Sequence, residues 1–333
     1  MIEYASNRVP LRRLAETGGV LAVITGITGT SYRNLGTMMA FGPDRQRTGS
    51  LSSGCIEDDI AEHAVTALRT GKSVTLRYGQ GSPFFDLKLP CGGGLQVLLI
   101  PNPDPVLLRA VLALGDARQV ATLSITAAGT LRLAPPTTNP DDLIITLEPE
   151  LRFWVYGHGI EAMSFALMAQ AAGYDVTLYG QSGLQTDLSR IGPLNITEVP
   201  SFRSYICPMP DRRTAIALFF HDHENEARIL AQFLPSDAFF IGAQGSLNAR
   251  NRLLADLTEI GVKSKHMANL EPSFGLIGSC RDPRTLAVSV LAHVLSVAGA
   301  KGLPYAQGQE RSGRPLPLVS APEGSAVSEI GRP

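Results

Sequence analysis

The chain alternates between short apolar runs, which predict strands, and stretches with apolar residues three or four positions apart, which predict helices. In the N-terminal part, residues 56–69 have the helical spacing, and Gly71 stands where such a helix would end. Strands are expected at the apolar runs around this helix, at 20–25, 37–41, 74–78 and 95–100. The pattern predicts an N-terminal α/β domain, which we expect to contain a mixed sheet.

The C-terminal part follows a regular strand–helix–strand order. A strand at 151–156 leads through a glycine turn into a helix that ends near Gly173, and a strand at 174–179 follows. The alternation continues with strands at 214–220 and 238–241 and helices at 225–234, 247–260 and 282–298. Parallel neighbours need a crossover between them, usually a helix. We therefore expect a Rossmann-like parallel-sheet domain.

The boundaries follow from composition. We place the two domains at 10–135 and 150–300, with the Pro-, Thr- and Asn-rich stretch 135–142 as the candidate linker. Ser246 and Asp282, the latter followed by proline, are expected to cap the last two long helices. Beyond residue 301 the periodicity vanishes, and we expect 301–333 to be a poorly ordered tail.

The overall composition excludes several classes of protein. The formal net charge of −1 argues against a broad nucleic-acid-binding surface, which needs a basic excess. Charged residues interrupt the first thirty positions, so neither a signal-peptide core nor a membrane span is expected there. The four cysteines form no CxxC pattern or dense disulfide framework, which favours a cytoplasmic protein with reduced thiols.

Two cysteines stand in glycine-rich turns, Cys55 after Gly54 and Cys91 before Gly92 and Gly93. Glycine leaves the backbone bare, so a bulky ligand can approach the thiol closely. We expect both thiols to contact a soft, metal- or sulfur-containing group, which makes them the candidate metal ligands and candidate catalytic groups. The alternative, that each is a small core hydrophobe, stays open.

Two charged residues accompany these turns. Glu57 follows Cys55 by two positions and could act as an acid or base, or could complement the helix dipole as we expect of Asp58 and Asp59. Arg33 lies between Gly29 and Gly36 and is a candidate anion anchor through its guanidinium fork. An ordinary surface arginine is the alternative.

The strand-to-helix turn Gly157-His158-Gly159, with Ala162 in the third place, satisfies the dinucleotide glycine fingerprint. Its amides could cradle a phosphate at the helix N-terminus, or its glycines could simply permit tight packing. NAD(P) is not favoured, since no acid follows the second strand, where Gly180 stands. A second glycine turn, with Gly245 and Ser246, could form another anion-binding nest.

Several motifs in one order resemble the XdhC/CoxI family, accessory proteins of xanthine dehydrogenase and related molybdenum hydroxylases. In the N-terminal domain they are GTSYRNLGTMM at 29–39, GSLSSGCIEDD at 49–59 and PCGGGLQVLL at 90–99. In the C-terminal domain they are the Rossmann turn, IGAQGSLNAR at 241–250 and FGLIGSCRDPRTLAVSVLAHVL at 274–295. The resemblance covers about 14–298.

The resemblance implies a chaperone rather than an enzyme. Family members bind the molybdenum cofactor, protect it while its terminal sulfido ligand is installed, and deliver it to the apo-hydroxylase. Molybdenum cofactor would thus be the cargo, held by Cys55, Cys91 and Arg33 with its phosphate at Gly157 and Gly159. An apo molybdenum hydroxylase is the implied partner. A cysteine desulfurase and a second copy of this chain are further candidates, whereas nucleic acid and membrane are not.

The chain departs from the family pattern at several positions. Ser53 stands where the family has glycine, and Gly180, Ile277, Arg284 and His293 stand where it has acids. These changes leave the thiol turns intact and remove acids from the second domain. Two other functions stay open: a non-catalytic interaction scaffold with an empty Rossmann unit, and an NAD(P)-dependent oxidoreductase.

Overall fold

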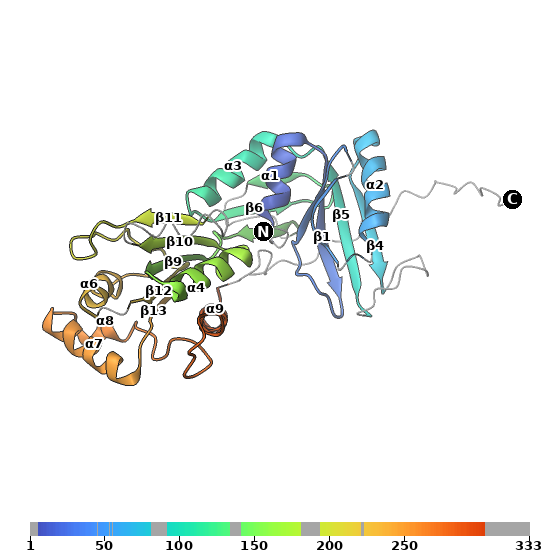
Figure 1. Ribbon diagram of the computed structural model, residues 1–333. Helices are drawn as coiled ribbons and strands as arrows, with labels where there is room; N and C mark the ends of the chain where they lie inside the picture. The colour runs from blue at the N-terminus through green and yellow to red at the C-terminus, as the bar shows by residue number, and fades with distance from the viewer. Residues whose placement is uncertain are drawn as a thin grey trace. The chain divides into compact units, whose positions relative to one another are not determined.

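The computed structural model describes residues 6–44, 46–52, 54, 56–80, 92–133, 141–180, 194–220 and 223–303, so nearly all of the predicted tail 301–333 lies outside the described residues. The chain forms two compact units, one reaching to Glu148 and the other starting at Pro149 (Figure 1). Both combine helices with sheets, which confirms the predicted α/β class.

The N-terminal unit is built on a five-stranded sheet. The strand order is β3 (Arg47–Gly49), β2 (Met38–Phe41), β1 (Val20–Thr28), β5 (Gly94–Pro101) and β4 (Val74–Gly79). All four neighbouring pairs are antiparallel, so the expectation of a mixed sheet was wrong for the described strands. The reason is α2 (Glu57–Thr70), which connects β3 at one edge to β4 at the other. Its crossover therefore brings no two parallel strands side by side.

A second, three-stranded sheet completes this unit. Its order is β7 (Leu131–Leu133), β6 (Ala121–Ile125) and β8 (Leu143–Leu147), and both pairs are antiparallel. Helices α1 (Arg8–Thr17) and α3 (Pro105–Asp116) pack together beside the sheets. Because β8 pairs with β6, the stretch 135–142 connects strands of one sheet, and the units divide after Glu148 instead.

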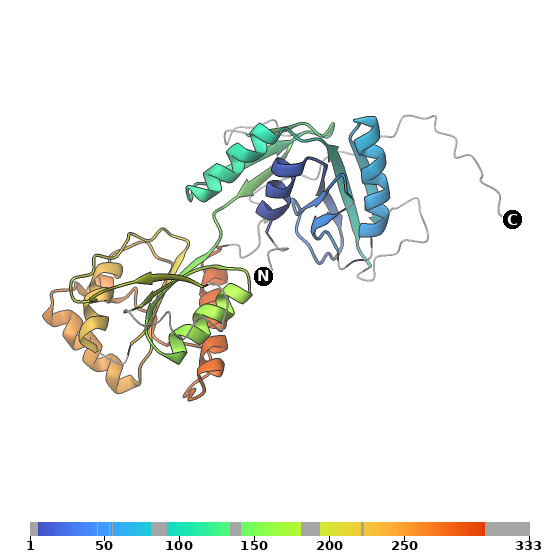
Figure 2. The same ribbon diagram turned by 45° about the horizontal axis from the view of Figure 1, so that its top comes forward.

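The C-terminal unit contains a parallel five-stranded sheet. Its order is β11 (Asn195–Glu198), β10 (Asp175–Gly180), β9 (Arg152–Gly157), β12 (Thr214–Phe219) and β13 (Phe240–Ala243), and every pair is parallel. One face is covered by α4 (Ile160–Ala171) and α9 (Pro283–Ala300), which lie side by side (Figures 1 and 2). The other is covered by α6 (His223–Phe233) and α7 (Leu247–Glu259), with the short α8 (Ser264–Met267) nearby. This confirms the Rossmann-like prediction.

The helix ends follow their predicted caps. The Ser246 hydroxyl accepts the Ala249 N–H over 3.2 Å, and the Asp282 carboxylate accepts the Thr285 N–H over 3.0 Å. Helix α9 is long and apolar enough to cross a membrane, the one such helix in the described ranges. Its buried residues, including Val290 and Val294, pack in the core of the C-terminal unit, as expected of a core helix.

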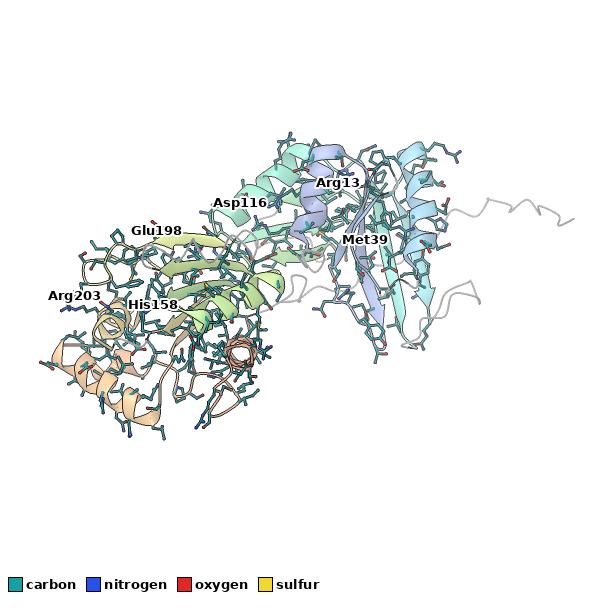
Figure 3. The ribbon with its side chains drawn as sticks, viewed as in Figure 1. Arg13, Met39, Asp116, His158, Glu198 and Arg203 are labelled. Atoms are coloured by element: carbon teal, nitrogen blue, oxygen red, sulfur yellow. The ribbon has the colours of Figure 1, made fainter. Side chains whose placement is uncertain are left out.

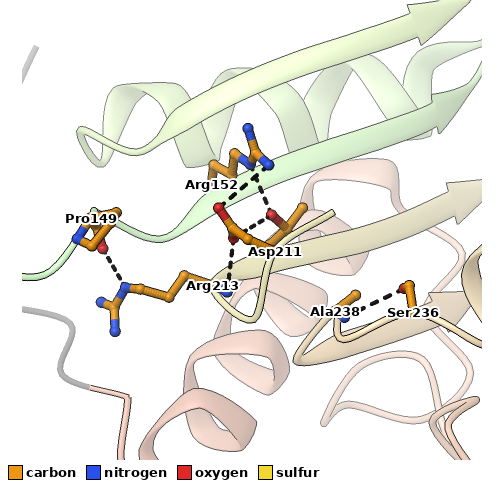
Figure 4. Close-up of polar contacts among 7 residues, drawn as sticks. Pro149, Arg152, Asp211, Arg213, Ser236 and Ala238 are labelled. Atoms are coloured by element: carbon orange, nitrogen blue, oxygen red, sulfur yellow. Dashed lines mark hydrogen bonds and ion pairs between the residues drawn. The ribbon is translucent and has the colours of Figure 1, made fainter. Parts of the chain in front are cut away.

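A polar network holds the amino-terminal ends of β9 and β12 together (Figure 4). The carboxylate of Asp211 accepts hydrogen bonds from the Thr214 hydroxyl over 2.8 Å and the Arg213 N–H over 2.9 Å. It also lies 3.5 Å from the Arg152 guanidinium. The buried Arg213 side chain donates to the carbonyl of Pro149, the first residue of this unit. The start of the C-terminal unit is thus fixed to its sheet.

Candidate functional site

Three predicted loops belong to the same end of the N-terminal sheet. Strands β1, β3 and β4 share one direction because each is antiparallel to a neighbour, β2 or β5, that runs the other way. The loops that follow these strands, 29–37, 50–56 and 80–93, therefore all start at the same end of the sheet, where the three strands finish. These loops contain the Arg33, Cys55 and Cys91 motifs, and α2 begins at the same end of the sheet.

Gly93 brings two of these loops into direct contact. Thr28, Gly94 and Gly79 lie side by side on β1, β5 and β4, and the Gln80 N–H donates to the Gly93 carbonyl over 3.1 Å. A Cβ on Gly93 would collide with the carbonyl oxygen of Thr30. Only glycine permits this approach, so Gly93 has a packing role in addition to the predicted ligand contact.

Gly54 and Gly92 present bare backbone instead. Both are exposed, with φ of 93° and 70°, and nothing described lies within 4 Å of where a Cβ would be. Their left-handed backbone favours glycine, and no described atom occupies the space above them. As far as the described residues show, both positions leave a ligand room to approach the backbone.

Arg33 lies in a loop that is anchored at its far end. The buried side chain of Asn7 donates to the Gly36 carbonyl over 3.0 Å and accepts the Met38 N–H over 2.8 Å. The Ser31 hydroxyl donates to the Arg33 carbonyl over 2.7 Å. The half-buried Arg33 guanidinium has no hydrogen-bond or ion-pair partner in the described part of the chain. An anchored loop thus presents a positive charge that no described side chain neutralises, as an anion anchor requires.

Glu57 holds the loop that carries Cys55. Its buried carboxylate accepts the Ser52 hydroxyl over 2.6 Å, the Ser52 N–H over 2.8 Å and the Ile56 N–H over 3.2 Å. Burial by itself would raise the pKa of Glu57. The hydrogen bonds from Ser52 and Ile56 together lower this pKa by more than burial raises it, so the pKa lies below its ordinary value. The side chain is ionised and fully engaged at neutral pH, which suits a positioning role.

The other two acids of this helix turn have separate partners. Asp58 is exposed and pairs with Arg47 of β3 at 2.5 Å. Asp59 accepts the hydroxyl of the buried Tyr78 of β4 over 2.6 Å, and lies 3.6 Å from the His63 ring nitrogen. Burial, with the Asp59 carboxylate second, raises the pKa of Tyr78 and keeps its proton in place. The start of α2 is thus tied to both edges of the sheet.

Cys55 and Cys91, the candidate metal ligands and catalytic groups, lie outside the described residues. Among residues that are described, no cluster of three or more His, Cys, Asp or Glu side chains forms a metal site. Cys207 is half-buried, and burial raises its pKa to about 12. Its thiol is therefore protonated and inert at neutral pH.

The Rossmann turn has the backbone geometry of its fingerprint. Gly157 has φ of 141°, and a Cβ there would collide with the Phe219 carbonyl on β12. Gly159, with φ of 97°, precedes α4, and the fully buried Ala162 packs in the core under the helix. His158 between them is exposed (Figure 3). The glycines thus permit close packing, as the simpler interpretation expects, and also leave Gly159 bare.

Sequence reasoning missed two acids at this end of the parallel sheet. Glu161 lies in the first turn of α4. Glu198 ends β11 in register with Gly180, the last residue of β10 (Figure 3). An acid therefore does stand one strand away from the position where a ribose acid is expected. Only the strand pairing, which the sequence did not predict, shows this.

The second glycine turn follows β13, at the same edge of the parallel sheet as the Rossmann turn. Gly245 and Ser246 are exposed there, with the Ser246 hydroxyl engaged as the α7 cap. His293, one of the departures, is buried; its Nδ1 accepts the Gly275 N–H over 3.3 Å and its Nε2 lies 3.9 Å from Glu271. The other departures on this stretch, Ile277 and Arg284, are exposed.

Fold and site together define a two-unit α/β protein in which glycine loops gather at one end of an antiparallel sheet and a Rossmann-like unit follows. Two family descriptions match this arrangement: "XdhC and CoxI family" over residues 13–79 and "XdhC Rossmann domain" over 153–294. The chain belongs to the XdhC and CoxI family.

Curated relatives match most of the chain. It is 30% identical over 285 residues to the molybdenum cofactor insertion chaperone PaoD of Escherichia coli strain K12, covering 84% of this chain and 83% of that protein. It is 22% identical over 320 residues to a probable xanthine dehydrogenase subunit from Bacillus subtilis strain 168, covering 83% of this chain and 92% of that protein.

A solved structure shares the fold. A crystal structure described as a xanthine dehydrogenase from Bacillus halodurans superimposes with a TM-score of 0.73 at 20% identity. It covers 89% of this chain and 96% of the other. At this identity the likeness establishes the fold, and the function has to be argued from the site.

Proposed function

We propose that this protein is a molybdenum-cofactor chaperone for a xanthine dehydrogenase-like molybdenum hydroxylase. The observation that carries the proposal is the gathering of the 29–37, 50–56 and 80–93 loops at one end of the N-terminal sheet. A relative 30% identical to this chain is named as a molybdenum cofactor insertion chaperone, which supports the same role here.

The chemistry of the cargo suits these loops. The cofactor combines an anionic phosphate, a dithiolene and a thiophilic metal. The Arg33 guanidinium, which pairs with no described residue, supplies a positive charge, and the bare backbone of Gly54 and Gly92 leaves room for a bulky ligand. Cys55 and Cys91 supply thiols that can meet the metal–sulfur end. Glu57 positions the Cys55 loop through its hydrogen bonds with Ser52.

Delivery follows from the proposed role. The chain holds the cofactor in the cytoplasm while its terminal sulfido ligand is installed by a cysteine desulfurase, then passes it to the apo-hydroxylase. Dimerisation would place two such binding sites in one assembly. Because the protein needs to release its cargo, we expect moderate affinity and reversible thiol contacts rather than a closed metal site.

Cofactor retention tests the proposal. The full chain is coproduced with the molybdenum-cofactor pathway, purified without oxygen, and its pterin is measured by fluorescence after oxidation. Arg33→Ala and the double variant Cys55→Ser, Cys91→Ser should each retain less than about a tenth of the wild-type pterin, as expected for loss of a central contact. Arg12→Ala, which removes an exposed arginine of α1, should retain all of it.

The same preparations can be mixed with cofactor-free hydroxylase to follow activation. A wild-type protein that carries no pterin and activates no hydroxylase would refute the chaperone role and favour a scaffold. Full retention by the double cysteine variant would refute the role of the thiols alone.

A further inference from the structure

The bare face of Gly159 is the place where a dinucleotide would bind in a Rossmann unit. Gly159 is the N-cap residue of α4, with φ of 97°, and it has no side chain to cap the helix. In dinucleotide sites the second glycine of the fingerprint lets the pyrophosphate reach the helix N-terminus. Whether a phosphate fits therefore depends on what lies around the position that a Cβ on Gly159 would take.

In this chain a carboxylate borders that space closely. The Oε2 atom of Glu161 is 3.3 Å from the position of a Cβ on Gly159. No described residue forms a hydrogen bond or ion pair with Glu161, so no described cation neutralises it. A phosphate approaching Gly159 would meet the Oε2 atom and the negative charge of this side chain.

Two effects then disfavour an anion. Like charges brought together at a binding surface oppose association strongly. The Glu161 carboxylate also offsets the partial positive charge of the α4 N-terminus, which would otherwise attract a phosphate. Residues of this chain therefore do not fit NAD(P), the cofactor that a Rossmann unit suggests.

The rest of the turn does fit a dinucleotide. Gly157 makes the close approach to β12, and Ala162 is fully buried beneath the helix. Glu198 lies beside Gly180 and supplies an acid near the ribose position. The lack of an acid at Gly180 therefore opposes dinucleotide binding less than Glu161, the additional acid at the phosphate position, does.

We propose that Glu161 is the specificity-determining residue of this Rossmann unit, and that it closes the turn to the phosphates of NAD(P) and free nucleotides. The phosphate of a cargo is excluded from Gly157 and Gly159 for the same reason. The inference stands independently of the chaperone role.

Calorimetric titration of the full chain with ADP and with NADH near neutral pH tests this inference. The variants are Glu161→Gln, which keeps the shape and removes the charge, and Glu161→Ala, which also opens the space. Asp175→Asn is the matched control, because it removes one exposed acid at the opposite end of β10. Circular dichroism and thermal unfolding verify that each variant is folded.

Wild type and Asp175→Asn should show no saturable binding in the millimolar range. Glu161→Gln and Glu161→Ala should bind ADP at least about tenfold more tightly, as expected when a like charge is removed from contact with an anion. Equal binding by wild type and the Glu161 variants would overturn the proposal. Failure of every folded variant to bind would also overturn it, since Glu161 would then not be the barrier.

Discussion

The Glu57 carboxylate accepts hydrogen bonds from both the hydroxyl and the backbone N–H of Ser52, over 2.6 and 2.8 Å. The sequence left open whether Glu57 acts as an acid or base or complements a helix dipole. The geometry adds a third role, because the first residue of α2 reaches back and fixes the loop before it. Ser52 and Ile56 flank Cys55, so this carboxylate sets where the segment with the proposed thiol ligand begins and ends.

Replacing Glu57 should destabilise the N-terminal unit. Glu57→Ala leaves the buried Ser52 N–H and hydroxyl without their acceptor, and we expect a loss of about 1–3 kcal/mol in the free energy of unfolding. Urea denaturation measures this change. The neighbouring Asp58→Ala is the control, because an exposed ion pair contributes about 0–1 kcal/mol. Equal losses in both variants would contradict the positioning role.

The stabilisation by Glu57 should depend on pH. Its pKa is lower in the folded protein than in the unfolded chain, so its contribution is complete above the unfolded pKa of about 4.3. It is lost as the pH falls through the lower, folded pKa. Wild type should therefore exceed Glu57→Gln in stability at neutral pH, and the difference should shrink below about pH 4. A difference constant from neutral to acid pH would show that the charge of Glu57 is irrelevant.

Gly93 should tolerate no side chain. Gly93→Ala forces the Thr30 carbonyl away from β5, and overpacking of this kind costs about 1–3 kcal/mol. Because the displaced loop carries Arg33, cofactor retention should fall as well. Gly278→Ala serves as the control, since nothing described lies within 4 Å of its Cβ position. Thermal unfolding and the pterin assay read the two effects separately, and an unchanged Gly93→Ala protein would contradict both.

Cys207 should resist alkylation. With its pKa raised to about 12, its thiolate is scarce, and reaction with iodoacetamide near pH 8 should be roughly a thousandfold slower than for an ordinary thiol. Peptide mass spectrometry follows the labelling of this residue over time. The same cysteine in urea-unfolded protein is the control and should react at the ordinary rate. Fast labelling in the folded protein would show that the thiol is accessible and ionised.

Sequence periodicity was enough to predict β9, β10, β12 and β13 and the four long helices of the C-terminal unit, but it missed the edge strand β11 and the short α8. Buried parallel strands such as 214–220 are continuous apolar runs, and Ser246 and Asp282 indicate where the helices begin. The strand order of the N-terminal sheet was harder to predict, because it depends on which edge of the sheet the chain reaches after α2. A helix between two strands suggests a parallel pair, but here it spans the whole sheet.

For the same reason, only part of the candidate site could be predicted from the sequence. Glycine turns and Arg33 are visible in the sequence as local patterns. The Asn7 anchor and the Tyr78–Asp59 pair join residues 31 and 19 positions apart, and no local signal indicates them. Glu161 could have been noticed as an acid inside the fingerprint, whereas Glu198 becomes informative only through its pairing with Gly180.

The position of β5 has a consequence for biosynthesis. This strand lies between β1 and β4, yet it is the last of the five to leave the ribosome. Until it inserts, β1 and β4 have no common neighbour, and the Gly93–Thr30 approach does not exist. In the proposed chaperone role, a nascent chain without β5 could not hold the cofactor, and capture would wait for a completed N-terminal sheet.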